Sequence, residues 1–140
     1  MAITLDAAAT LLNGLVGKGT GILGSSCYMG LSTTTPNSDG TGFTEPTDAS
    51  YARTIIGLSG QSATQVMGTP ANKAIENNKI IYFPEATGDW GTVTHFGLFT
   101  SASGGKPLIY GALTSAVDID GSATPVVPLF RVGSFTLAVS

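Results

Sequence analysis

The first third of the chain encodes a strand that enters a polar loop and returns as a second strand. It reads Cys27-Tyr-Met-Gly-Leu-Ser-Thr-Thr-Thr-Pro36, followed by Gly42-Phe-Thr-Glu-Pro46 and Tyr51-Ala-Arg53. Aromatic and β-branched residues favour strands, whereas Ser, Gly and Pro favour turns. The stretch therefore predicts two strands joined by a loop over residues 34–50, which is long enough to serve as a contact arm. It contains no evident catalytic set.

The chain beyond Gly24 continues this β pattern. Strands are predicted at residues 25–33, 51–58, 79–83, 93–100, 108–114 and 131–139, with short candidates at 63–67 and 125–129. Turn clusters rich in Gly, Pro, Asn and Asp separate them. Short strands without intervening helical patterns predict a mainly β fold, an antiparallel β-sandwich or jelly roll. In the last strand, alternation places Phe135, Leu137 and Val139 on the more apolar face.

Residues 4–17 carry the one convincing helical pattern. Thr4 is the expected N-cap, and Gly17 can supply a left-handed end. One face holds most of the apolar side chains, namely those of Leu5, Ala8, Leu12 and Leu15. A helix this short is marginal alone, so we expect it to dock either on its own sheet or on a neighbouring subunit.

Length and composition set the class of protein. A chain of 140 residues fits one domain, which we divide into a helix with a Gly-rich linker at 1–22 and a β-sandwich at 23–140. Charged residues make up only 11%, and the mean hydropathy is +0.28. Such a poorly charged, apolar surface is typical of a protein buried in an assembly.

Charge and hydropathy also exclude several classes of partner. The net charge is −3, and the six basic residues are scattered, whereas phosphate binding requires clustered Lys and Arg; we therefore expect no nucleic acid. No apolar run approaches the roughly 18 residues of a membrane span, so no membrane partner is expected. The first residues lack the basic start of a signal peptide, which predicts assembly in the host cytoplasm.

Candidate chemical groups are few. Cys27 is the only cysteine and reads as a small buried hydrophobe, and His95 is the only histidine. We expect a structural His95 that contacts a Thr or a backbone carbonyl. Gly17-Lys-Gly-Thr-Gly21 lacks the spacing of a phosphate loop, and Asp118-Ile-Asp-Gly121 reads as a turn without the later ligands of a calcium loop. The sequence therefore predicts no catalytic residues, no metal site and no cofactor.

The layout of residues 25–115 resembles the small structural proteins of tailed-phage virions, some labelled capsid cement (decoration) proteins and others tail-fibre proteins. The quoted 27–53 stretch carries this resemblance, together with Phe83-Pro-Glu-Ala86, Trp90-Gly-Thr-Val-Thr-His-Phe-Gly-Leu-Phe99 and Gly111-Ala-Leu-Thr114. The resemblance implies a non-enzymatic virion protein. The first expectation is a cement protein on the capsid surface that binds the major capsid protein across subunit joints. The alternative is a tail-fibre or receptor-binding module in which Trp90 and the Thr-rich loops face host saccharide.

Self-association is expected as well. Low charge and probable edge strands leave surface that a symmetric dimer would cover, with a trimer as the alternative. Aromatic residues usually serve as core or interface anchors. The side chains predicted to lie at interfaces are Leu5, Leu12, Leu15, Phe43 and Trp90.

Overall fold

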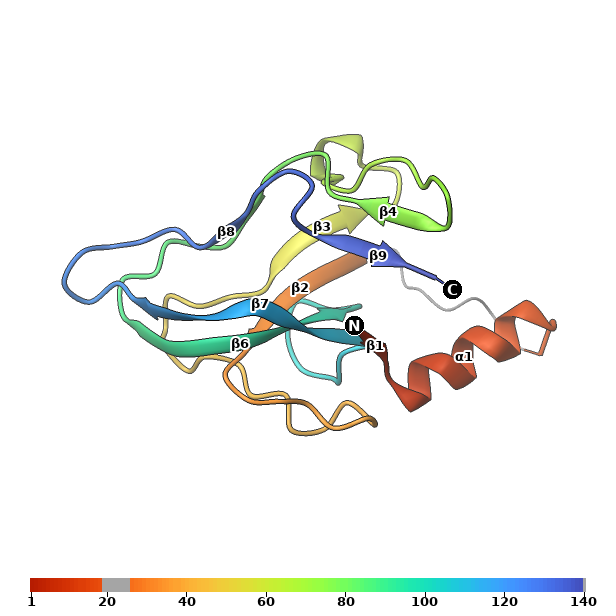
Figure 1. Ribbon diagram of the computed structural model, residues 1–140, viewed down its shortest axis with the longest axis horizontal. Helices are drawn as coiled ribbons and strands as arrows, with labels where there is room; N and C mark the ends of the chain where they lie inside the picture. The colour runs from red at the N-terminus through yellow and green to blue at the C-terminus, as the bar shows by residue number, and fades with distance from the viewer. Residues whose placement is uncertain (19–25, 140) are drawn as a thin grey trace.

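A five-stranded antiparallel sheet forms the centre of the computed structural model, which describes residues 1–18 and 26–139 (Figure 1). Its strand order is β1-β7-β6-β2-β3. The bounds are Ala2–Ile3 for β1, Ser26–Ser32 for β2, Thr54–Leu58 for β3, Asp89–Phe99 for β6 and Ile109–Asp120 for β7. The hairpin of β6 and β7 is the longest pairing, and β2 lies against its other side.

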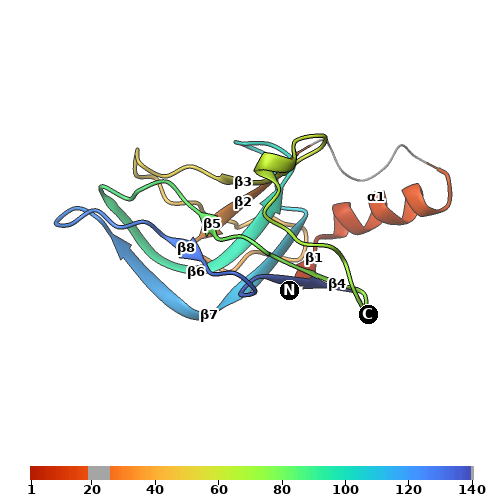
Figure 2. The same cartoon turned by 90° about the horizontal axis from the view of Figure 1, so that it is seen from above.

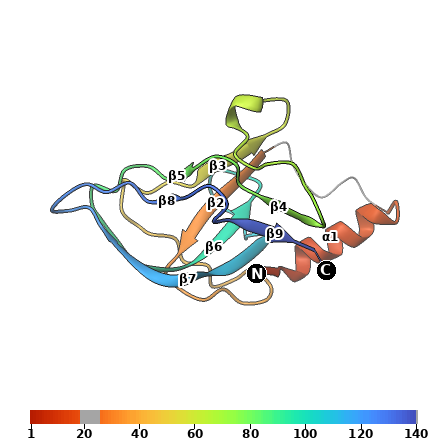
Figure 3. The ribbon, with the colours of Figure 1, turned by 45° about the horizontal axis from the view of Figure 1, so that its top comes forward.

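Two short ribbons accompany the main sheet (Figure 3). One pairs β4 (Ala74–Glu76) with β9 (Thr136–Ala138), and the other pairs β5 (Ile81–Tyr82) with β8 (Leu129–Phe130). Both pairings are antiparallel, as are all those of the main sheet. The predicted mainly β, antiparallel fold with one short helix is confirmed, and the arrangement is consistent with a β-sandwich.

The hydrophobic core joins the main sheet to the two ribbons. Phe96 of β6 meets Phe135, just before β9, edge to face with ring centroids 5.1 Å apart. The buried members of the core are Met29, Leu31, Ile56, Ile81, Phe83, Ala86, Trp90, Val93, Phe96, Leu98, Ile119 and Phe135. Burial of these side chains provides the main driving force for folding, about 1.5–3 kcal/mol for each large one.

The helix α1 (Leu5–Leu15) begins and ends where the sequence predicts. The carbonyl of Thr4 accepts the Ala8 N–H, but the Thr4 hydroxyl and N–H both donate to the Leu108 carbonyl, at 3.2 and 2.8 Å. Thr4 therefore ties the start of the helix to the sheet instead of capping it with its side chain. At the other end Gly17 has φ +76°, and the Lys18 N–H reaches the Asn13 carbonyl at 2.8 Å, which is the bond of a left-handed helix stop.

Several predicted boundaries differ from the structure. The two-residue strand β1 and the strand β4 were not predicted, and β7 runs on to Asp120 through a predicted turn. Residues 62–64 form a 3₁₀ turn that overlaps the short strand candidate at 63–67, and only Thr136–Ala138 of the predicted last strand pairs. Phe135 and Leu137 face the core as predicted, whereas Val139 is 71% exposed. The Gly-rich linker falls largely on residues 19–25, outside the described residues.

A large irregularity interrupts the pairing of β6 with β7. Between the pairs Val93–Val117 and His95–Ala112, β6 advances by two residues and β7 by five. This excess in β7 bends the hairpin and breaks strict alternation in β6. Val93 therefore lies in the core with Phe96, three residues on, whereas Phe99 packs on Phe43 outside this core cluster.

Candidate interaction surfaces

The exposed side of α1 carries most of its large apolar side chains. The exposed fractions are 63% for Leu5, 61% for Leu12, 74% for Leu15 and 68% for Val16. We call these four residues the α1 stripe. Figures 1 and 2 show the helix projecting from one end of the sheet, where no other described segment covers it. The three leucines predicted as interface residues are thus exposed, and their interface role stays a prediction.

The other side of α1 packs only partly against the rest of the chain. Ala7 is the only buried residue among those of α1 whose burial is described. Between the helix and the turn before β7 lies a hollow of about 380 Å³. Asp6 and Thr10 line it from the helix, and Lys106 lines it from the turn, with the Lys106 Nζ 3.8 Å from the Asp6 carboxylate. The Asp6 side chain is 80% exposed, so this pair lies near solvent, and the inner side of the helix consists of buried Ala7 with half-buried Ala8 and Leu11.

A second apolar surface lies at the end of the β6–β7 hairpin that holds Val117 and Ile119. It is an open groove of about 420 Å³ beside the irregular part of β7. Its partly exposed apolar side chains are those of Leu113, Val117, Val126, Val127 and Leu129. Residues 125–129 were predicted as a short strand but not as part of a surface, although the Pro-Val-Val-Pro-Leu-Phe run at 125–130 is uniformly apolar.

Phe43 holds the long loop against the sheet. Its ring meets Phe99 edge to face at 5.1 Å and lies over Gly97, where an added Cβ would come within 2.6 Å of it. The Thr33 N–H donates to the Thr44 carbonyl, and the Thr34 hydroxyl donates to the Gly42 carbonyl. The loop predicted as a contact arm is therefore folded back on its own sheet, and half-buried Phe43 offers only part of its ring to a partner.

Trp90 lies in the core, with only 2% of its surface exposed. Its Nε1 donates to the Ser50 Oγ at 2.9 Å, and its ring meets Tyr51 edge to face at 5.1 Å. Both the interface role and the saccharide-facing role predicted for Trp90 are therefore corrected. The cause is its place in β6, which points the indole inward behind the segment that follows residue 48.

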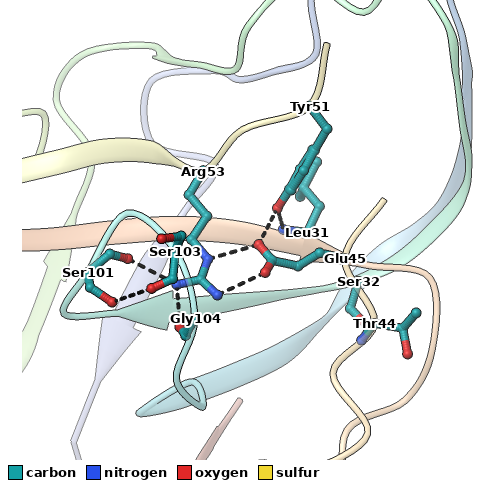
Figure 4. A network of polar contacts seen from close by, with 9 residues as sticks. All are labelled: Leu31, Ser32, Thr44, Glu45, Tyr51, Arg53, Ser101, Ser103 and Gly104. Carbon is teal, nitrogen blue, oxygen red and sulfur yellow. Dashed lines mark hydrogen bonds and ion pairs between the residues drawn. The ribbon is translucent and has the colours of Figure 1, made fainter. Parts of the chain in front are cut away.

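A polar network fixes the segment after β2 (Figure 4). The Arg53 Nε and Nη2 donate to the two carboxylate oxygens of Glu45, each at 2.8 Å, and its Nη1 donates to the carbonyls of Ser101 and Gly104. The Arg53 guanidinium also stacks 3.3 Å from the centre of the Phe99 ring. The directional hydrogen bonds therefore fix the position of this buried cation, in addition to its charge attraction to Glu45.

Tyr51 extends this network to the edge of β2. Its hydroxyl donates to Glu45 Oε1 at 2.8 Å and accepts the Leu31 N–H at 2.9 Å. The β2–β3 pairing stops at Met29–Thr54, so the phenol supplies the hydrogen-bond partner for the Leu31 N–H beyond it. Burial raises the pKa of the Tyr51 phenol well above its ordinary value. This network was not predicted, although Glu45 and Arg53 are rare charges within the quoted 27–53 stretch.

The remaining ionisable groups play local structural roles. Hydrogen bonds from the hydroxyl and N–H of Thr41, Ser50 and Ser122 lower the pKa values of Asp39, Asp48 and Asp120, respectively. The His95 Nδ1 lies 2.8 Å from the Thr94 hydroxyl, which confirms the predicted contact with a Thr. Burial raises the pKa of the Cys27 thiol, which packs against the core, to about 11.

Within 1–18 and 26–139, no three His, Cys, Asp or Glu side chains gather closely enough to hold a metal ion. In the same ranges no helix has the length and apolar character needed to cross a membrane.

Comparison with known proteins identifies the family of the chain. No curated protein matches the chain. Residues 2–136 match the family described as Podophage GP4 fiber I protein gp80. The match bears out the resemblance to phage virion structural proteins and accords with the fibre alternative at least as well as with a cement role. Because it spans nearly the whole sequence, the chain belongs to the Podophage GP4 fiber I protein gp80 family of phage structural proteins.

Proposed function

We propose that this protein is a building block of a phage tail fibre, held in the virion by burial of nearly uncharged surface against neighbouring proteins. The main support is the exposed α1 stripe, because an apolar patch exposed to solvent marks a site of contact with another protein. The name of the matching family supports the fibre over other virion locations.

The energetics suit a structural role. Burying apolar surface stabilises an interface by about 25 cal/mol per Å², and a standard interface buries about 800 Å² on each partner. The α1 stripe and the groove at Leu113 and Val117 contain few charges that would have to lose water on contact. Repetition of such contacts along a fibre multiplies their effect.

The proposed role is non-enzymatic and uses no cofactor. The strongest polar cluster, built on Arg53 and Glu45, satisfies its own hydrogen bonds and ties three chain segments together. The guanidinium donates its hydrogen bonds to a carboxylate and to backbone carbonyls of the same chain, which is the geometry of a structural clamp.

Immunogold labelling of intact virions tests the proposal. Antibody against the purified protein should place gold on the tail fibres. Gold over the head would overturn the fibre role and favour the cement role, with the major capsid protein as partner. In that case, heads that lack the protein should release DNA at lower temperature than complete heads.

A further inference from the structure

We propose that α1 of one copy packs lengthwise against α1 of a second copy, with the α1 stripe at the centre of the contact. The occupant of the exposed helix face is thus another molecule of this chain. The proposal deepens the structural role above by naming the partner, and it rests on that role only for its biological purpose.

The first argument is the orientation of the helix. An ordinary surface helix turns its apolar side to its own core. Here buried Ala7 and half-buried Ala8 and Leu11 form the inner side of the helix, whereas the larger side chains of Leu5, Leu12 and Leu15 lie in solvent. Two hydrogen bonds from Thr4 to the Leu108 carbonyl fix the start of the helix in this orientation. The small residues of the helix therefore face its own chain, and three of its four leucines are left in solvent.

The second argument is the spacing of the stripe. Leu5, Leu12 and Leu15 of the stripe, with half-buried Ala8 between the first two, follow one another at intervals of three, four and three residues. This is the a/d spacing of a coiled-coil seam, in which each side chain inserts between residues of a facing helix. Ala9 and Val16 follow the seam on one side and widen it, and both are exposed.

The third argument is that the stripe suits its own copy. The charged side chain of α1, Asp6, lies off the seam and near Lys106. A two-fold contact sets the same patch against itself, which brings like charges together unless the patch is uncharged. The α1 stripe contains only leucine and valine, so it meets that condition.

The fourth argument concerns area. A helix of 11 residues is roughly 16 Å long. Its contact with one other helix falls short of the ~800 Å² per partner of a standard interface, although exposed Met1 and Ile3 extend the apolar surface at its start. The association should therefore depend on concentration in solution and strengthen where copies are held together in an assembly.

A matched pair of variants tests the contact in the full-length protein. Leu12→Glu places a charge on the seam, whereas Asn13→Glu places the same charge one residue on, off the stripe. Sedimentation over a concentration series should show self-association of the unchanged protein, at least tenfold weaker association for Leu12→Glu, and little change for Asn13→Glu. Because Leu12 is 61% exposed, both variants should keep the melting temperature of the unchanged protein.

Mixing charges makes the test specific to a second copy. Leu12→Lys alone should associate as weakly as Leu12→Glu, and an equimolar mixture of the two should regain association. An unchanged protein that stays monomeric at millimolar concentration would overturn the inference. So would equal weakening by Asn13→Glu, or a mixture that associates no better than its components.

The labelling experiment separates this inference from the proposed function. Self-association through Leu12 with gold absent from the fibres would contradict the function alone. Gold on the fibres with a monomeric protein would contradict this inference alone and point to a different virion protein on the α1 stripe.

Discussion

Arg53 and Glu45 form a two-pronged ion pair, in which two guanidinium nitrogens each lie 2.8 Å from a carboxylate oxygen. The Arg53 side chain is 3% exposed and that of Glu45 is 26% exposed. Through the carbonyls of Ser101 and Gly104 the same guanidinium also holds the turn after β6. One side chain therefore links the loop after β2, the approach to β3 and the β6–β7 turn.

Loss of this guanidinium should be among the most damaging single changes. Arg53→Ala leaves a partly buried carboxylate and two carbonyls without their partner, so the free energy of unfolding should fall by about 3–5 kcal/mol. Arg53→Lys should recover only part, because an ammonium cannot reproduce the two parallel bonds. Urea unfolding measures both, with exposed Lys79→Ala as a control expected within about 0.5 kcal/mol of the unchanged protein. A loss for Arg53→Ala no larger than the control would contradict the clamp.

Gly121 marks a close approach of two chain segments just after β7. An added Cβ would lie 1.8 Å from the Ala86 carbonyl oxygen, which is backbone and has little freedom to move. Gly121→Ala should therefore lower the free energy of unfolding by about 3 kcal/mol. Gly104→Ala meets nothing within 4 Å and bears only the cost of its positive φ, about 1 kcal/mol. Thermal melts that rank the two variants in the opposite order would count against the close approach.

Ser50 is the polar partner that allows Trp90 to be buried. Its Oγ accepts hydrogen bonds from the Trp90 Nε1 and the Thr87 N–H, and it also contacts the Asp48 carboxylate. Ser50→Ala should cost about 1–3 kcal/mol, since it leaves the Nε1 donor of buried Trp90 and the Thr87 N–H without this partner. In a Trp90→Phe background the cost should shrink, because one of those donors is gone. Additive losses in a double-mutant cycle would show that the two side chains are not coupled.

Cys27 predicts a specific loss of stability in alkali. Its thiol pKa is raised from 9.0 to about 11 in the folded chain, so the folded state favours the protonated form. The resulting stabilisation is fully present below pH 9 and is lost as the pH rises toward 11. Cys27→Ala should remove this part of the pH dependence. The difference between the two stability curves measures it, and curves that run parallel from pH 8 to 11 would refute it.

The elements with a clear residue period were predicted from sequence. Leu5, Leu12 and Leu15 define the helix by their spacing, and Gly17 ends it as expected. By contrast, β1 is two residues long and has no period to detect. Its pairing with β7 depends on how the chain returns 106 to 108 residues later, which is a tertiary property.

The candidate sites were predictable only where exposure follows from a local pattern. The helix stripe shows in the sequence because its period places it on one face. Trp90 was misassigned because an aromatic anchor looks the same at a core and at an interface, and only the position of Ser50 and Tyr51 decides between them. Likewise, the pairing of Arg53 with Glu45 spans a loop whose closure no short-range pattern encodes.

The unpaired residues of β7 also divide the hydrogen bonding of the β6–β7 hairpin into two parts. Leu113, Thr114, Ser115 and Ala116 have no register partners on β6, whereas Ile109–Ala112 and Val117–Asp120 do. Amide hydrogens are protected from exchange with solvent in so far as their hydrogen bonds persist. The hairpin should therefore exchange as two separate protected blocks with a fast-exchanging gap between them, so that the end bearing the apolar groove can open while the end beside α1 stays closed.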